Sequence, residues 1–157
     1  MTTAESRVLA EEQAALRRLA RLVAGGARSE EVFAAVTEEV GRLLGADHAA
    51  LSRYESDRTL TYLAAWTGAG TPVPPVGTRV SIRGNNVSSL VFETRRPARI
   101  DSYADASGPL APAIREEGVR SAVGTPIIVE GHVWGVIGVG SVFELPRPAP
   151  AQPQPQP

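Results

Sequence analysis

The residue types in this chain best suited to binding a ligand stand together in residues 81–91, SIRGNNVSSLV. Gly84 and two amides precede a run with helical spacing, and the free backbone N–H groups at a helix start can hold an anion. The stretch has neither the lysine nor the further glycines of a phosphate-binding loop. Asn86 as the N-cap, with Ser89 three residues on, explains the same pattern without a ligand. Both interpretations, an anion grip and a helix cap, stay open.

The other reactive residue types argue against catalysis. The chain has no cysteine, which excludes disulfides, thiolate zinc sites and thioether-linked chromophores. Its histidines, His48 and His132, have no second histidine or cysteine at ligand spacing, so solvated turn residues are the better interpretation. No nucleophile elbow is present, and the paired glutamates lie on predicted helices, where adjacent side chains point apart. We therefore expect neither an enzyme nor a metal site.

A candidate pocket remains. Small-ligand sites are usually concave and mostly apolar, with a few polar groups. Ring residues near the predicted sheet would supply the apolar part, although each one alone is more typical of a core. Polar residues near strand ends and helix starts would supply the rest. The candidate ligand-binding residues are Tyr54, Trp66, Arg79, Asn85, Asn86, Asp101, Tyr103, Ile114 and Ser121.

Length and charge limit the number of domains and the kinds of partner to be expected. The 157 residues predict one domain, and the 43% hydrophobic and 21% charged fractions are ordinary for a globular protein. With a net charge of −1 and both signs mixed, no broad field attracts nucleic acid or anionic lipid. The longest apolar run, residues 133–139, is too short to span a bilayer, and the N-terminus does not resemble a signal peptide. We expect a cytoplasmic protein with no nucleic-acid and no membrane partner.

Helical spacing predicts four helices. The first, residues 4–24, carries a narrow apolar stripe of Leu9, Leu16 and Val23 on a charged rod, which indicates either packing on the domain or a dimer seam. The second begins at Ser29, expected as its N-cap, and stops at Gly45. The third follows Asn86 and is stopped by Pro97, and a short irregular helix is expected over residues 109–117.

Runs of strand formers predict a sheet. In the second run, alternation places Leu60, Tyr62, Ala64 and Trp66 on one face. The last two runs, which flank a turn at Glu130, are almost entirely apolar and are expected at the sheet centre, covered on both faces. Antiparallel hairpins at both ends with helices between them favour an α+β fold. The predicted strands are residues 49–54, 59–66, 78–82, 98–101, 121–129 and 132–140.

Three blocks carry a resemblance to a known family: EEVFAAVTEEVGRLLGADHAALSRYE, NNVSSLVFETRRPARIDSYAD and EGVRSAVGTPIIVEGHVWGVIGVGS. From about residue 29 to residue 142 the chain resembles a GAF domain, of the kind found in sensor modules of actinobacterial histidine kinases and related signalling proteins. The resemblance implies a PAS/profilin-like antiparallel sheet of five or six strands with helices on both faces. It also implies a ligand pocket between the sheet and residues 85–117, which would place Asn85 and Asn86 at its rim, and dimerisation through terminal helices.

The departures from the family narrow the expected ligands. Bilin-binding relatives use a cysteine, so a covalent bilin is excluded, as are the methionine sulfoxide reductases of this fold. The asparagine-lysine-phenylalanine-aspartate-glutamate motif of cyclic-nucleotide relatives is absent, and residues 105–120 lack the axial histidine of haem relatives. Neither cyclic nucleotide nor haem is expected, and the cofactor is unknown.

The expected organisation is an N-terminal helix and candidate dimer seam at residues 1–28, a GAF-like domain at 29–145 and a disordered proline-rich tail at 146–157. Family members normally continue into a long helix, whereas this sequence runs into the tail with no kinase output domain. The leading hypothesis is a non-enzymatic sensory module, related to two-component systems, that binds an unidentified small molecule or transmits a signal through its terminal helices. The alternative is a ligand-free structural or dimerisation module.

Overall fold

The strand-rich runs near residues 50 and 130 pair with each other at the centre of one antiparallel sheet. The computed structural model of the chain describes residues 2–68, 74–116 and 118–142. The strand order is β3-β2-β1-β6-β5-β4, so the two central strands come from opposite ends of the fold. The strands are β1 His48–Tyr54, β2 Thr59–Thr67, β3 Arg79–Ser81, β4 Ala98–Ile100, β5 Ser121–Val129 and β6 His132–Ser141.

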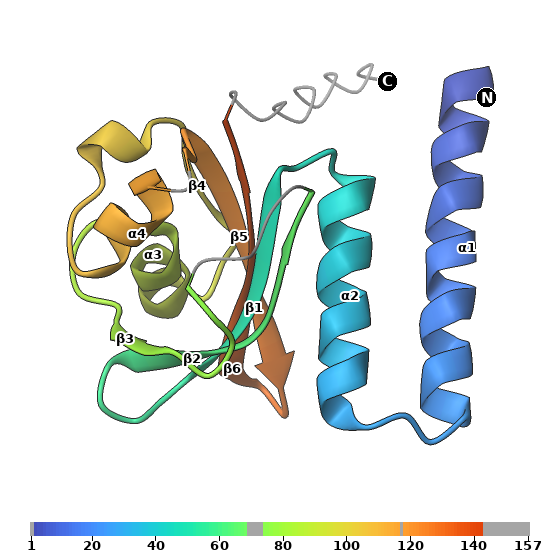
Figure 1. Cartoon of the computed structure of the whole chain (residues 1–157), viewed down its shortest axis with the longest axis horizontal. Coiled ribbons are helices and arrows are strands. Elements are labelled where there is room, and N and C mark those ends of the chain that lie inside the picture. The colour runs from blue at the N-terminus through green and yellow to red at the C-terminus, as the bar shows by residue number, and fades with distance from the viewer. Residues whose placement is uncertain (1, 69–73, 117, 143–157) are drawn as a thin grey trace, which may run out of the picture.

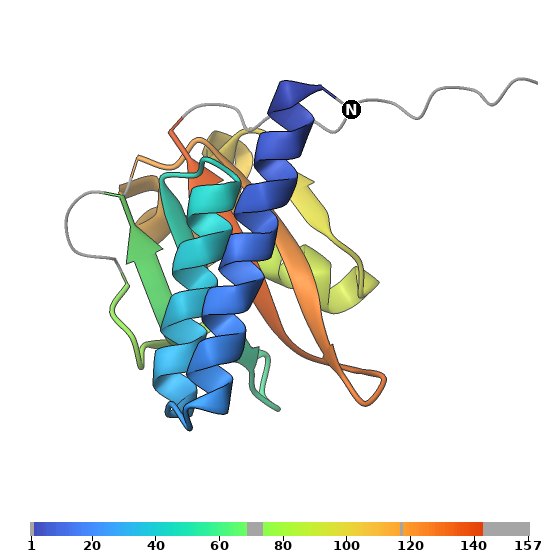
Figure 2. The same ribbon diagram turned by 90° about the vertical axis from the view of Figure 1, so that its right-hand side faces the viewer.

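Helices cover both faces of the sheet. On one face α2 packs against β1 and β2, while α1 runs alongside α2 as an outer layer (Figures 1 and 2). On the other face α3 packs against β4, β5 and β6, with η1 and α4 beside it (Figure 1). This α+β arrangement is the fold class that the sequence predicts. The helical elements are α1 Thr3–Ala24, α2 Ser29–Leu43, α3 Val87–Thr94, the 3-10 turn η1 Tyr103–Asp105 and α4 Leu110–Glu116.

The helix ends agree only partly with the predicted signals. The expected cap at Ser29 is wrong: Arg28 holds the N-cap position of α2 without a side-chain bond, and Ser29 is already helical. The stop at Gly45 is confirmed, since this residue has a φ of 63°, where glycine is favoured. A capping box, not among the predicted signals, starts α1, where the side chains of Thr2 and Glu5 each accept the other residue's backbone N–H.

A bulge in the β1–β2 hairpin overturns the prediction that Leu60, Tyr62, Ala64 and Trp66 share one face. The pairing register shifts there, which leaves one extra residue in β2, and an extra residue reverses the alternation of faces beyond it. Leu60 and Tyr62 accordingly pack in the core on the α3 side, whereas Trp66 packs in the smaller core under α2.

The β5–β6 hairpin is central at one end and exposed at the other. β6 lies between β1 and β5, and its residues Val136 and Val139 are buried on opposite faces. The expected cover on both faces is wrong for the tip, where Ile128 and Val129 are 51% and 47% exposed. The tip extends sideways, away from α1 and α2 (Figure 2).

Parts of the chain named in the sequence predictions lie outside the described residues. These are the proline-rich tail at 146–157, residues 69–73 and 143–145 of the expected domain, and residue 117 at the end of the helix expected over 109–117. Within the described ranges, no helix is both long enough and apolar enough to cross a membrane.

Candidate functional site

Small residues of the central strands form a floor under α3 and α4. Gly124, Gly138 and Gly140 all face this side of the sheet, but their surroundings differ. A Cβ on Gly124 would lie 2.3 Å from a methyl carbon of Val87, and one on Gly140 would lie 2.9 Å from a methyl carbon of Val119. A Cβ on Gly138 would meet nothing closer than a backbone oxygen at 3.7 Å. The floor is therefore filled at two glycines and open at Gly138.

A pocket of about 90 Å³ includes this open position. Ile114 of α4 and Val87 of α3 contribute to its apolar walls, together with Val119 and Val136. Its polar lining includes His48, Ser52, Ser88 and the ring residues Tyr62 and Tyr103. No arginine, lysine, aspartate or glutamate is among the described residues that line it.

Two loops hold η1 and α4 over the sheet by backbone contact. Gly84, before α3, and Gly108, before α4, have φ values of 101° and 93°, a region that glycine adopts readily. A Cβ on Gly108 would lie 1.7 Å from the carbonyl oxygen of Arg83, so the contact has no room for a side chain. The backbone N–H of Asn85 donates to the Ser107 hydroxyl at 2.8 Å, and the Ser107 N–H donates to the Asn85 carbonyl at 2.9 Å.

Asn86 links this loop contact to the start of α3. Its side chain is completely buried, and its amide oxygen accepts the Ser89 N–H at 2.9 Å as the helix N-cap, as predicted. Its amide nitrogen lies 3.2 Å from the carbonyl oxygens of both Ile82 and Arg83 and 3.4 Å from that of Ser107. The whole amide is therefore used within the protein, and Asn86 does not line the pocket.

Tyr103 forms the pocket wall on the η1 side. It is 2% exposed, and its hydroxyl accepts the Val87 N–H at 3.4 Å. Arg115 of α4 fixes the same turn by donating to the carbonyls of Tyr103 and Ala106 at 3.1 and 2.9 Å. Burial raises the pKa of the Tyr103 hydroxyl, so this group is uncharged at neutral pH.

The structure brings three of the predicted site residues to the pocket, namely Trp66, Tyr103 and Ile114. The indole ring of Trp66 nevertheless packs toward α2, where a Cβ on Gly41 would lie 2.4 Å from it. Tyr54 stands behind the α3 wall: its ring lies 5.0 Å from that of Phe92, and its hydroxyl donates to the Ser88 carbonyl at 2.6 Å. Burial raises the pKa of Tyr54 as well.

The remaining predicted residues lie away from the pocket lining. Asn85 is exposed at the loop contact. Asp101 follows the edge strand β4 and pairs with Arg99 at 2.6 Å. Ser121 is completely buried at the start of β5, opposite Ser141. A ligand-binding role for these residues stays a prediction.

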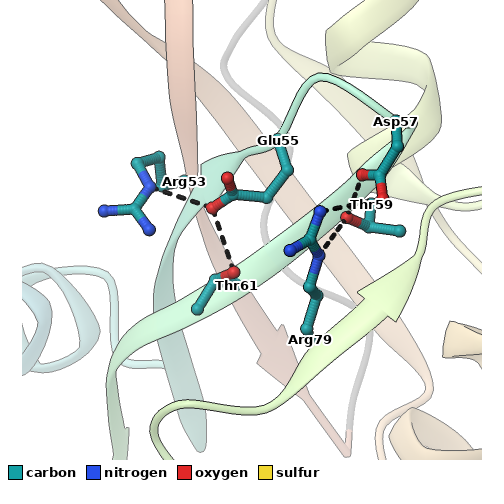
Figure 3. Close-up of polar contacts among 6 residues, drawn as sticks. All are labelled: Arg53, Glu55, Asp57, Thr59, Thr61 and Arg79. Carbon is teal, nitrogen blue, oxygen red and sulfur yellow. Dashed lines mark hydrogen bonds and ion pairs between the residues drawn. The ribbon is translucent and has the colours of Figure 1, made fainter.

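Arg79 belongs to a polar cluster at the β1–β2 turn (Figure 3). Its neighbour Val80 packs in the α3-side core, so Arg79 itself faces the other side of the sheet from the pocket. Its guanidinium donates to the Asp57 carboxylate and to the Thr59 hydroxyl, each at 2.8 Å. Thr59 in turn donates to Asp57 at 2.5 Å. The Thr59 hydroxyl first, and then Arg79, lower the pKa of Asp57 to about 2. Arg79 is thus committed to an ion pair at the β1–β2 turn.

A second group in the same cluster is centred on Glu55. Arg53 donates to its carboxylate at 2.9 Å and the Thr61 hydroxyl donates to the same oxygen at 3.0 Å (Figure 3). These two bonds lower the pKa of Glu55. The cluster pairs its charges internally, so it stabilises the hairpin and offers no excess charge to a ligand. Across the described residues no group of three histidine, cysteine or acidic side chains is placed to hold a metal ion.

The residues that shape the pocket are not among those predicted from the sequence. Gly138 and Ser52 alternate with larger apolar residues in central strands, and a glycine inside a strand can mark a close backbone approach or a gap. That signal was present in the run GVIGVG, but it does not tell which glycine is filled by a neighbour.

Comparison with known proteins matches this architecture to one family. The GAF domain family profile matches residues 28–155, which is most of the chain. The chain belongs to the GAF domain family. Among curated proteins no sequence relative matches it.

Solved structures of GAF domains share this fold at low sequence identity. The phycoerythrobilin-bound GAF domain of a cyanobacterial phytochrome has a TM-score of 0.69 at 15% identity, over 88% of this chain and 86% of that one. An A. aeolicus nlh2 GAF domain in an inactive state has a TM-score of 0.65 at 18% identity, over 87% and 83%. The GAF domain of an Acinetobacter phosphoenolpyruvate-protein phosphotransferase has a TM-score of 0.62 at 15% identity, over 84% and 77%. Such neighbours establish the fold, and the family is one of sensory and signalling modules.

Replacing Asn86 should cost much more stability than replacing its neighbour. Asn86→Ala removes the cap of α3 and leaves buried carbonyls without a donor, so we expect a loss of about 2–4 kcal/mol in urea unfolding. Asn86→Asp keeps the acceptor for Ser89 but turns a carboxylate oxygen toward buried carbonyl oxygens, so its loss should be at least as large. The control Asn85→Ala, at an exposed side chain, should stay within about 0.5 kcal/mol of wild type. Equal losses at the two asparagines would contradict this role.

The Asp57 cluster predicts a pH dependence below pH 4. Because the pKa of Asp57 in the fold lies below its ordinary value of 3.8, its bonds stabilise the fold above that value and are lost as the pH falls toward 2. NMR titration should give about 2 for Asp57 in wild type. Both Thr59→Val and Arg79→Gln should move it toward 3.8. The control Thr61→Val should raise the pKa of Glu55 and leave that of Asp57 unchanged; an Asp57 pKa that ignores Thr59 would rule out the proposed cause.

Proposed function

We propose that this chain is a non-enzymatic sensory GAF module that binds a small molecule in the pocket over Gly138. The observation that carries the proposal is the open floor at Gly138, beside Gly124 and Gly140, which are covered by valines. A core packed only for stability would be expected to fill such a position, because interiors are close-packed and a void loses contacts. Polar groups at an otherwise apolar pocket are typical of ligand sites.

The pocket lies where an occupant could influence the end of the sheet. His48 lines it, and the adjacent Asp47 carboxylate accepts the Ser141 hydroxyl at 3.0 Å and the Val142 N–H at 2.8 Å. A ligand that changes the packing of α4 or β1 would therefore act close to both the α2–β1 turn and the end of β6. Coupling between a ligand and a distant output is typically about 1–3 kcal/mol, enough to bias a two-state partner.

The large cofactors of the family do not fit this pocket. A covalent bilin needs a cysteine, and the sequence has none. The volume of about 90 Å³ is also well below the roughly 300–1,000 Å³ of ordinary cofactor and drug-sized sites. We propose neither bilin, haem nor cyclic nucleotide as the ligand. We propose a cytoplasmic role in two-component or related signalling, like that of the actinobacterial histidine-kinase sensor modules that the sequence resembles.

A second candidate function, dimerisation, is supported by the outer surface of α1. Leu9, Leu16 and Val23 are 43%, 66% and 64% exposed, although they recur every seven residues. Arg18 of α1 makes a two-bond ion pair with Glu39 of α2 at 2.6 and 2.8 Å, which holds α1 to its own domain. The stripe is therefore available to the α1 of a second copy, as in a parallel coiled coil. In a ligand-free module this seam would be the whole function.

Closing the floor should abolish ligand binding without unfolding the protein. In Gly138→Val the added methyl groups enter the open space, so a compound that binds the pocket should raise the melting temperature of wild type and not of the variant. A thermal-shift screen with neutral, anionic and cationic metabolites tests this, since a ligand at about 100 times its Kd adds roughly 2.7 kcal/mol. If no compound stabilises wild type, or if each compound stabilises both proteins equally, the sensory proposal fails.

A charge in the middle of the α1 stripe should prevent dimerisation. We expect Leu16→Glu to be monomeric in sedimentation velocity at concentrations where wild type is a dimer, because the charge would be buried at the seam. Arg17→Glu, which changes a neighbouring exposed residue outside the stripe, is the matched control and should remain dimeric. A monomeric wild type at high micromolar concentration would remove the dimer hypothesis.

A further inference from the structure

The pocket contains polar groups that the protein itself does not use. Ser52 of β1 is only 3% exposed and faces the pocket, opposite Val136 of the α3-side core. Within the described part of the chain its hydroxyl takes part in no hydrogen bond. No described buried side-chain nitrogen or oxygen is both covered and unpaired, so the little surface that Ser52 keeps includes its hydroxyl.

Ser88 of α3 offers a second hydroxyl of this kind. It lines the same pocket, and within the described residues only its backbone carbonyl is used, as the acceptor for Tyr54. A serine hydroxyl both donates and accepts, so each can pair with a neutral oxygen or nitrogen of a ligand. A ligand that covers these hydroxyls must pair them, because a polar group buried without a partner costs free energy.

The same pocket is unsuited to a charged ligand. Its described lining has no arginine, lysine, aspartate or glutamate, and valines, alanines and Ile114 make up much of the wall; His48, at the start of β1, is the one lining side chain that can carry a positive charge. A buried ion without an opposite charge is strongly unfavourable. The volume limits size as well: an apolar cavity of about 150 Å³ holds benzene, so about 90 Å³ suits a molecule of roughly four or five non-hydrogen atoms.

We propose that the pocket over Gly138 selects a small neutral molecule with an apolar body and one carbonyl or hydroxyl group, which hydrogen-bonds Ser52. This deepens the sensory function proposed above and rests on it. The apolar body occupies the space above Gly138, between Ile114 and Val136. Selectivity against acids of the same size follows from the absence of arginine and lysine in the described lining, and selectivity against hydrocarbons follows from the serine hydroxyls.

Three small probes separate the effects of charge, hydrogen bonding and apolar contact. They are 2-butanone, which is neutral with one carbonyl; propionate, which is charged; and xenon, which is apolar. Amide chemical shifts of the full chain are followed by NMR during titration with each probe. We expect 2-butanone to shift the amides around Gly138 and to bind at least about ten-fold more tightly than propionate. Xenon should enter the same pocket.

Two variants test which residue supplies the hydrogen bond and which supplies the apolar space. Ser52→Ala should weaken 2-butanone about five-fold, the effect of one neutral hydrogen bond, and leave xenon binding unchanged. Gly138→Val should abolish both; if it folds poorly, Gly138→Ala, which adds one methyl group without a close contact, should weaken both. Ser56→Ala, at an exposed turn residue, is the control for a serine substitution and should change neither.

Several results would overturn the proposal. Propionate binding as tightly as 2-butanone would remove the selectivity for neutral molecules, and an unchanged 2-butanone affinity in Ser52→Ala would remove the hydrogen bond. A charged metabolite that stabilises wild type but not Gly138→Val would refute the neutral ligand class while the sensory function stands. If neither the probes nor any metabolite binds wild type, the sensory function itself fails.

Discussion

The backbone contact between Gly84 and Gly108 is the constraint on which the ligand side of this fold depends. Each glycine has a positive φ, and a side chain on Gly108 would collide with the Arg83 carbonyl. Since the backbones touch, the buried Asn86 amide can reach carbonyls of both loops while it caps α3. One small region therefore sets the start of α3, the position of η1 and the height of α4 above the sheet. This region holds the two loops together, and its residues do not line the pocket.

The pocket exists because α4 is held at a fixed height above the small residues of the central strands. Val87 packs on Gly124 and Val119 packs on Gly140, but no side chain packs on Gly138. The remaining space is lined by aliphatic carbons, hydroxyls, aromatic rings and His48, and by no acidic, arginine or lysine side chain in its described part. On the opposite face of the sheet, Arg79 and Asp57 pair with each other. A pocket without arginine, lysine or acidic side chains in its described lining is consistent with a site for a small neutral molecule.

The fold was predictable because its signals are local. Helical and alternating spacing, together with stops such as Gly45 and caps such as Asn86, place most elements correctly, and the family resemblance supplies the sheet. The bulge that turns Trp66 away from Tyr62 was not predictable, because one extra residue in a strand leaves no mark in composition. The site was found only in part: Tyr103 and Ile114 line the pocket, whereas Asn85, Arg79 and Asp101 looked suitable by residue type alone. Gly138 differs from Gly124 only through its distant neighbours, which the sequence does not reveal.

The central claim is that the glycine contact holds η1 and α4 in place over an otherwise independent sheet. Native-state hydrogen exchange of Gly108→Ala against wild type measures this directly, because subglobal opening is seen amide by amide. Our account predicts faster exchange for amides of residues 103–116 and of the first turn of α3, with protection retained in β1, β2 and α2. Uniformly faster exchange across the whole domain, or unchanged exchange in residues 103–116, would contradict it.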